Sequence, residues 1–226
     1  SDRQDDLLLD KFIEAGQQAG FPYTRDFNGA QQEGFSRYEH TINDTPRGPR
    51  RWSSARAYLH PVLNRKNLSN ETNVTVDKLI FDGKKAKGIE YVNEKGVRTK
   101  CFVNDEVILS AGALSSPQIL MRSGIGDSNE ITKHGIGMVH ELKGVGKNLQ
   151  DHYGVTCSFY ATKPVTLHRS ASWLKTQLAG VKYLLLGTGD AAYPPCSGGA
   201  FFKSSPDKDL PDTQLHYVSF QSPDQH

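Results

Sequence analysis

The sequence predicts an α+β fold with two lobes. Three extended runs separated by short polar turns lie between residues 72 and 102, and this spacing is typical of an antiparallel meander and not of βαβ units. An apolar run at 106–110 and a helix-forming segment at 111–126 follow. Apolar periodicity predicts two further helices, at 5–20 and at 172–186. We therefore expect one lobe built on the meander and a second lobe built from the flanking segments.

The segments before the meander predict one strand and two helices. Residues 5–20 carry an apolar stripe at helical spacing, and residues 34–42 alternate as a strand would. Ser53 or Ser54 can cap a short helix that stops near Pro61, because proline removes a backbone donor.

The middle of the chain contains a strand, a turn and a helix in succession. The apolar run at 106–110 predicts a short strand buried on both faces. Ser116 is placed to cap a helix with Pro117 at its first position, and Gly124 can end that helix. The residues between strand and helix are small, so a planar molecule could approach the backbone closely there.

The last third of the chain mixes strand and helix patterns. From Val155 onward the pattern is strand-like, and the helix at 172–186 is followed by a Gly/Pro-rich loop at 187–199. Further strands are expected at 199–203 and 213–220.

Composition excludes several classes of function. The net charge is +2 over 226 residues, which gives no electrostatic reason to expect a nucleic-acid partner. The basic run at 47–51 is interpreted as a solvated loop or as internal salt bridges. Three widely spaced cysteines form no CxxC or Cys/His cluster, so no metal site is indicated. No run of 18 apolar residues exists, so no transmembrane helix is expected.

Residues 112–126, Gly-Ala-Leu-Ser-Ser-Pro-Gln-Ile-Leu-Met-Arg-Ser-Gly-Ile-Gly, match the second signature of the glucose–methanol–choline (GMC) flavoenzymes. The resemblance extends from about residue 10 to about residue 220, nearly the whole chain. Other blocks that resemble the family are Asp26–Gly29, Arg51–Leu59, Gly88–Tyr91, Gly144–His152, and, closest to its choline dehydrogenase branch, residues 164–168 and 197–202.

The resemblance implies FAD as cofactor and a two-lobe GMC fold. It implies that the backbone of Val76 holds the adenine and that Ser110, Ala111 and Gly112 lie beside the ADP half of FAD. Residues 56–154 would then be part of the FAD-binding lobe. Residues 1–55 and 155–226 would belong to the substrate lobe, whose antiparallel sheet bears on the isoalloxazine.

Two parts of the family pattern have no counterpart among these residues. No GxGxxG turn between a strand and a helix is found, and the family's C-terminal catalytic histidine region would begin after His226. We therefore expect an internal fragment that has no catalytic residue of its own, that is inactive alone and that binds FAD poorly. His152 matches a motif position that orders a loop, and a structural role is expected for it.

The implied reaction of the parent protein is the oxidation of a primary alcohol, choline-like, aliphatic or aromatic, to the aldehyde by hydride transfer to the flavin. Ser197 stands where choline-oxidising relatives carry a glutamate, and Asp190 is the nearest acid before it, so choline itself is in question. A hydroxynitrile lyase with non-redox FAD and a non-catalytic truncated product are the alternatives.

The electron acceptor and the oligomeric state stay open, and the expected location is the cytoplasm or the periphery of the inner membrane.

Overall fold

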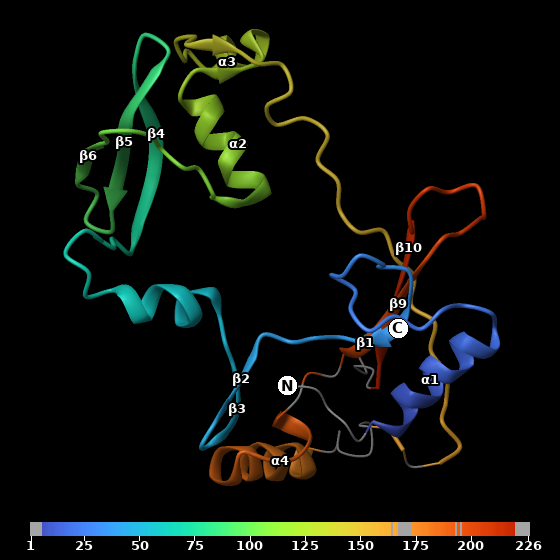
Figure 1. Cartoon of the computed structure of the whole chain (residues 1–226). Helices are drawn as coiled ribbons and strands as arrows, with labels where there is room; N and C mark the ends of the chain where they lie inside the picture. Colours follow the sequence, from blue (N-terminus) through green and yellow to red (C-terminus); the bar gives the residue numbers. More distant parts are fainter. Residues whose placement is uncertain (1–5, 164, 167–172, 193, 195, 220–226) are drawn as a thin grey trace. The chain divides into compact units, whose positions relative to one another are not determined.

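The computed structural model describes residues 6–163, 165–166, 173–192, 194 and 196–219 (Figure 1). The chain divides into two compact units, one formed by residues 1–62 together with 156–226 and the other by residues 63–155. The structure is mixed α and β, as the sequence predicted, and each unit has its own antiparallel sheet.

In the first unit, helix α1 (Leu7–Gln18) packs on a three-stranded sheet. The helix begins where the carboxylate of Asp6 accepts a hydrogen bond from the backbone N–H of Leu9 at 3.2 Å, an ordinary N-cap. The sheet is antiparallel throughout, with β9 in its centre. Its strands in spatial order are β1 (Gly34–Arg37), β9 (Cys196–Phe202) and β10 (Thr213–Val218).

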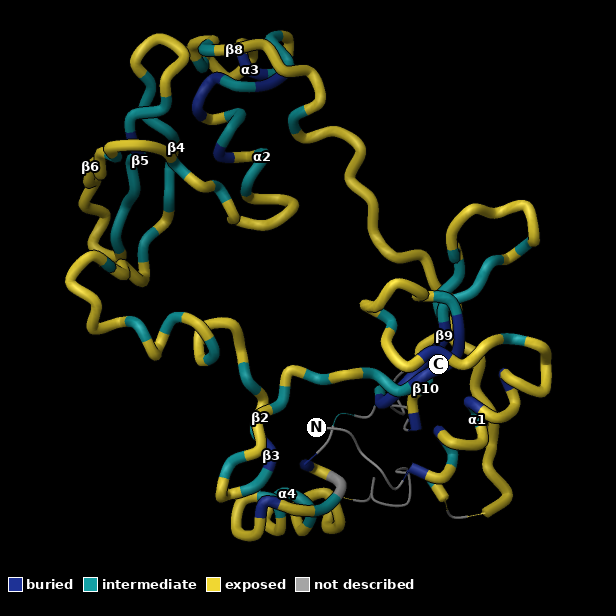
Figure 2. The backbone as a smooth tube through the Cα atoms, in the orientation of Figure 1, coloured by how far each residue is buried: buried dark blue, intermediate teal, exposed yellow. Residues whose placement is uncertain are grey.

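The core of this unit lies between α1 and the sheet, where buried residues gather in Figure 2. It consists of Leu9, Ile13, Phe35 and Ala200. Glycines allow this close packing, because a Cβ on Gly16 would lie 2.5 Å from the ring of Phe35. Helix α1 and strands β9 and β10 confirm the predictions for 5–20 and for the last two strands, although β9 begins three residues earlier than expected. The strand predicted at 34–42 is confirmed only for 34–37, since residues 38–41 belong to no strand.

The first unit also contains a hairpin, strands β2 (Ile42–Thr45) and β3 (Gly48–Arg51), and helix α4 (Trp173–Leu186). The interpretation of 47–51 as a solvated loop was therefore wrong. The Thr45 hydroxyl closes the turn, since it accepts from Arg47 N–H at 3.3 Å and donates to the carbonyl of Gly48 at 2.7 Å. Helix α4 confirms the prediction for 172–186, while residue 172 itself lies outside the described residues.

The expected short helix after Ser53 is present as two single turns, a π turn η1 (Ala55–Leu59) and a 3-10 turn η2 (His60–Val62). The hydroxyl of Ser53 accepts from the backbone N–H of Arg56 at 3.3 Å. The prediction of a strand from Val155 onward was wrong. The described residues 151–163 form no strand, and Phe159 and Tyr160 are more than nine-tenths exposed.

The second unit is the predicted meander followed by a helix. Its strands β4 (Val74–Asp82), β5 (Lys85–Asn93) and β6 (Arg98–Phe102) pair in chain order, and helix α2 (Gly112–Arg122) packs on β4. The unit is completed by a two-stranded parallel ladder and a short helix. These are β7 (Ile125–Gly126), β8 (His140–Glu141) and α3 (Ser128–Lys133).

Two predictions for the strand–turn–helix segment were wrong. Residues 106–110 belong to no strand, and Ile108 is 79% exposed, because no described strand lies beside them. Helix α2 begins at Gly112 and not at Pro117, which lies inside it. Ser116 does not cap the helix, because its hydroxyl accepts from the backbone N–H of Ala111 at 2.9 Å. The predicted glycine stop is confirmed, with Gly124 at a φ of 84° directly after the C-cap Ser123.

Candidate functional site

Helix α2 is fixed to the meander at its C-terminal end. The hydroxyl of Ser123 accepts from the backbone N–H of Leu79 at 2.8 Å and donates to the carbonyl of Ile119 at 2.5 Å. Beside it, Arg122 pairs with Asp77 on β4. Both contacts join the last turn of the helix to one strand, so they set the direction in which α2 leaves the sheet.

Asp77 is available for this contact because of an irregularity in β4. Val76 pairs with Tyr91 and Lys78 pairs with Glu90, so Asp77 is an extra residue in the ladder. Its side chain is largely buried and also pairs with Arg98 of β6. The bulge therefore turns the Asp77 carboxylate toward Arg98 and Arg122. It also places Val76 directly before Asp77, the residue through which β4 contacts helix α2.

Val76 lies on an edge strand. Because the sheet order is β4-β5-β6, β4 has a partner strand on one side only within the part of the chain that the structure describes, and half of its backbone N–H and C=O groups point away from β5. The Val76 side chain is half-buried. An edge strand of this kind can offer main-chain hydrogen bonds to the edge of a planar base, which is the role that the family resemblance implies for Val76.

Ser110, Ala111 and Gly112 lie at the opposite end of α2 from Ser123, and all three are exposed. Gly112 has a φ of 91°, which favours glycine, and a Cβ built on it would meet nothing within 4 Å. The turn therefore presents bare main chain to open space. A flat ligand fits such a surface, and among the described residues no atom lies close enough to Gly112 to require a glycine there for packing.

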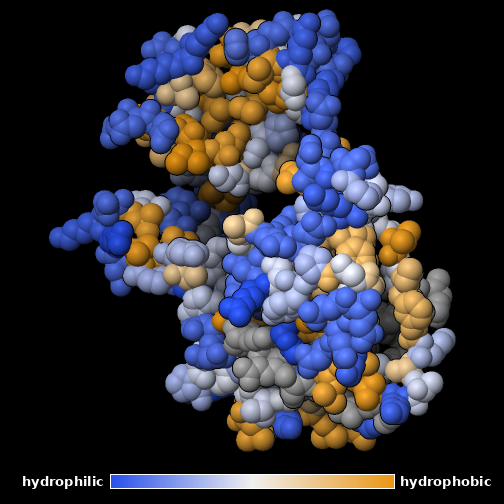
Figure 3. Space-filling view, turned by 45° about the vertical axis from the view of Figure 1, so that its right-hand side comes forward, coloured by the Kyte–Doolittle hydropathy of each residue, from blue (hydrophilic) through white to orange (hydrophobic). Residues whose placement is uncertain are grey.

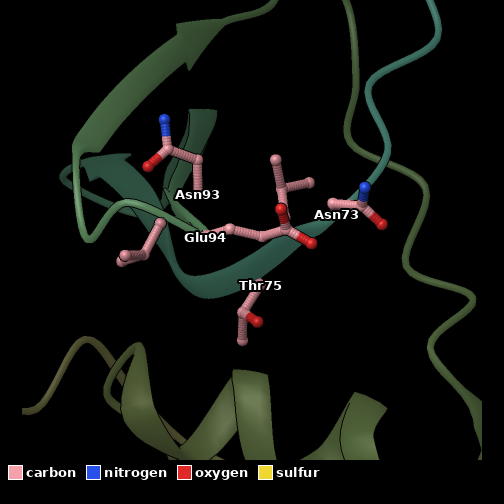
Figure 4. A pocket seen from close by; sticks show the side chains of 6 residues that line it. Asn73, Thr75, Asn93 and Glu94 are labelled. Atoms are coloured by element: carbon pink, nitrogen blue, oxygen red, sulfur yellow. The ribbon is translucent and has the colours of Figure 1, made fainter.

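A shallow hollow of about 380 Å³ adjoins Val76 at the start of β4. Figure 4 shows the side chains around it: Asn73 just before β4, Thr75 on β4, Asn93 at the end of β5 and Glu94 in the turn that follows. Its lining offers amide, hydroxyl and carboxylate groups, so it can accept and donate hydrogen bonds to the polar part of a ligand held along β4. Sequence reasoning missed Asn93 and Glu94, because they form a hairpin turn and match no motif.

The first unit carries a separate polar cluster on the sheet face opposite α1. The hydroxyl of Tyr38 lies 3.1 Å from Nδ1 of His216, and the Sγ of Cys196 lies 3.8 Å from the same nitrogen. The Tyr38 side chain lies over Gly199. A Cβ built on Gly199 would come within 2.2 Å of the Tyr38 hydroxyl. Burial raises the pKa of Tyr38 and that of Cys196, so both side chains are neutral near pH 7.

The hydrogen bonds of Tyr38 fix the tautomer of His216. The carbonyl of Leu215, at 3.2 Å, can only accept, so the phenol donates its proton there. The amide of Gln214 donates to the phenol oxygen at 3.3 Å. Nδ1 of His216 then also donates to this oxygen.

Ser197, which the sequence placed at the substrate-determining position, does not lie in this cluster. A register shift at the end of β9, where Tyr217 pairs with Gly198 and Val218 with Cys196, turns Ser197 toward α1. There it is buried and donates to the carboxylate of Asp6 at 3.1 Å. Cys196, and not Ser197, lies on the sheet face that carries Tyr38 and His216. Tyr38, Cys196 and His216 come from three distant segments, so no local motif could have assembled them.

The family of the chain follows from comparison with known proteins. The family model for GMC oxidoreductase matches residues 2–154, which is more than half of the chain. The chain belongs to the GMC oxidoreductase family. Mouse mitochondrial choline dehydrogenase is 43% identical over 214 residues, or 95% of this chain and 35% of that protein. The oxygen-dependent choline dehydrogenase of Escherichia coli is 42% identical over 212 residues, 93% of this chain and 38% of the relative.

Solved GMC structures show the same fold. A formate oxidase from Aspergillus oryzae superposes with a TM-score of 0.80 at 22% identity, covering 97% of this chain and 43% of the other. A fungal aryl-alcohol oxidase gives a TM-score of 0.65 at 24% identity, covering 87% of this chain and 33% of the other. The chain therefore spans little more than a third of the length of its choline dehydrogenase relatives.

As a GMC oxidoreductase related to choline dehydrogenase, the chain belongs to a family that binds FAD and acts on CH–OH groups. Among the residues that the structure describes, no three Cys, His, Asp or Glu residues gather in a metal-binding group. Within the same residues no helix is both long and apolar enough to cross a bilayer. The matched motif residue His152 is exposed, and its backbone N–H donates to the carboxylate of Asp151.

Proposed function

We propose that the complete protein containing this chain oxidises a primary alcohol to the aldehyde, with FAD as hydride acceptor. When bound, FAD supplies the two-electron chemistry by taking up the hydride. The unit at 63–155 is the part of the FAD lobe that holds the ADP half. The unit formed by 1–62 and 156–226 is part of the substrate lobe.

The observation that carries the proposal is the bare turn at Gly112. Ser110, Ala111 and Gly112 are exposed at the start of a helix, and open space lies where a Cβ on Gly112 would be. The edge strand β4 offers the backbone of Val76 to the same cofactor. Family membership makes FAD the ligand that both surfaces would serve.

The substrate class is inferred from the sheet face that carries Tyr38, Cys196 and His216. Cys196 and Tyr38 are neutral near pH 7, and Ser197 is buried against Asp6 on the other side of the sheet. None of these three side chains supplies an anion to pair with a trimethylammonium group. We therefore infer that an uncharged aliphatic or aromatic primary alcohol is preferred to choline.

Anaerobic addition of an alcohol to the complete flavoprotein tests this function. Bleaching of the oxidised flavin absorbance by benzyl alcohol or hexanol is the expected result, with choline bleaching it more slowly. A hydroxynitrile lyase of the same family would keep its flavin oxidised with every alcohol. An unbleached spectrum with all three compounds would therefore overturn the proposal.

A further inference from the structure

Asp6 is a buried carboxylate at the junction of helix α1 and the sheet of the first unit. Hydrophilic side chains cover much of the surface that Figure 3 shows, whereas Asp6 is only 7% exposed. Besides the backbone N–H of Leu9, its carboxylate accepts hydrogen bonds from the hydroxyl of Ser197 at 3.1 Å and from that of Tyr217 at 3.4 Å. A buried carboxylate needs such donors, because its charge has lost contact with water. One side chain therefore connects the first turn of α1 to both β9 and β10.

Regular alternation along β9 would place Ser197 on the other face of the sheet. Gly199 lies on the cluster face, which is the sheet face opposite α1. Gly198 faces α1, because a Cβ built on it would lie 2.4 Å from a methyl group of that helix. Successive residues of a strand point to opposite faces, so Ser197 should lie on the cluster face and Cys196 against α1. The bulge reverses both positions, since the residue left unpaired with β10 is Ser197.

The size of the two side chains does not decide between these registers. The side chains of Cys196 and Ser197 differ only in the atom that follows Cβ, so either can fit on either face. A hydroxyl is a strong hydrogen-bond donor, whereas a thiol is a weak one. The Asp6 carboxylate therefore stabilises the register that turns Ser197 toward it. The carbonyl of Ser197 accepts from the backbone N–H of Tyr38 at 2.9 Å, so the bulged residue is also held from β1.

We propose that Asp6 is a positioning residue that selects the bulged register of β9, and that it thereby determines that Cys196, and not Ser197, faces the substrate. Asp6 lies behind the sheet and acts through the hydroxyl of Ser197. The consequence for the substrate rests on the proposed function, in which the cluster face belongs to the substrate side. The choice of register does not depend on that function.

Alkylation of Cys196 in the complete flavoprotein tests the register. Labelling with iodoacetamide is followed at this one cysteine by peptide mass spectrometry, so the exposed Cys101 and Cys157 do not contribute. Asp6→Ser keeps an N-cap acceptor for α1 but is too short to reach Ser197. Once the register is released, the thiol lies mostly against α1, and its alkylation rate should fall at least about fivefold.

Three further variants separate the register from general damage. Asp6→Asn keeps the cap and a polar partner for the Ser197 hydroxyl, so it should restore at least about half of the wild-type rate. Ser197→Ala should lower the rate as Asp6→Ser does, and the double variant should lower it no further. Asp10→Ser is the matched control, because it removes an ion pair between the same helix and Arg37 and should leave the rate unchanged. Equal or faster alkylation in Asp6→Ser overturns the proposal, since general loosening only exposes the thiol.

Steady-state kinetics test the functional consequence. Asp6→Ser should raise KM for hexanol about fivefold and change kcat less than about twofold, because it alters the side chain that faces the alcohol and leaves hydride transfer to the flavin. An unchanged KM overturns the positioning role. If the wild type oxidises no alcohol, the proposed function fails, while the alkylation rates still decide whether Asp6 selects the register.

Discussion

Ser123 lies at the C-cap of α2, and its hydroxyl accepts a 2.8 Å hydrogen bond from the backbone N–H of Leu79 on β4. The pair joins the helix to the edge strand of the meander at a buried position. Because Gly112 lies at the far end of the same helix, this contact helps to set where the bare turn is held relative to Val76.

Replacing Ser123 with alanine should destabilise the unit at 63–155. The variant leaves the partly buried Leu79 N–H without its partner, which costs about 1 kcal/mol. Chemical denaturation of the complete protein should show this loss in the free energy of unfolding. Ser128→Ala is the control, because the Ser128 hydroxyl bonds only at the surface, to Glu141, and its loss should cost less than about 0.5 kcal/mol.

Gly112→Ala should weaken FAD binding about tenfold, or about 1.4 kcal/mol. The added Cβ meets no protein atom, but it occupies the open main-chain surface and strains a residue whose φ is 91°. The dissociation constant is measured by flavin fluorescence on the apoprotein. Gly96→Ala separates strain from ligand contact, since Gly96 has a φ of 75° and equally open surroundings in a distant hairpin turn. If both variants lose FAD to the same degree, the contact with the cofactor is refuted.

The sequence predicted those elements that depend on local pattern. Helix α1, the three strands of the meander and the glycine stop at Gly124 all follow from periodicity, turn chemistry and capping. Two predictions that assumed a partner strand, for 106–110 and for the segment from Val155, were wrong, because an apolar run carries no information about what lies beside it.

The polar cluster could not be predicted for a different reason. The strand order β1-β9-β10 brings Tyr38, Cys196 and His216 together. Cys196 rather than Ser197 belongs to this cluster because of a bulge between β9 and β10. A one-residue change of register exchanges the two faces of a strand, and the sequence around Ser197 contains no signal for such a change. The roles of Val76, Ser110, Ala111 and Gly112 stay predictions.

Tyr38→Phe should change how stability depends on pH in the alkaline range. Burial raises the pKa of Tyr38 above that of an exposed tyrosine, so the folded protein holds the phenolic proton more tightly than the unfolded chain. This contribution is fully present below about pH 10 and is lost as the pH rises from there through the folded pKa. In Tyr38→Phe the free energy of unfolding should fall less steeply in this window. Equal slopes for the two proteins would contradict the assignment.

Cys196→Glu should shift substrate preference toward choline. The new carboxylate would stand on the sheet face with Tyr38 and His216, and an anion there attracts a quaternary ammonium. We expect the ratio of kcat/KM for choline to that for hexanol to rise at least about tenfold, or about 1.4 kcal/mol. Ser197→Glu is the comparison, because that carboxylate would face Asp6 behind the sheet and should destabilise the protein without raising the ratio.

A structure of the complete protein with bound FAD would show whether the unit at 63–155 holds the adenine half of the flavin. We expect main-chain hydrogen bonds from Val76 to the adenine and van der Waals contact between the ADP moiety and Ser110–Gly112. An ADP moiety bound away from both β4 and the start of α2 would contradict it.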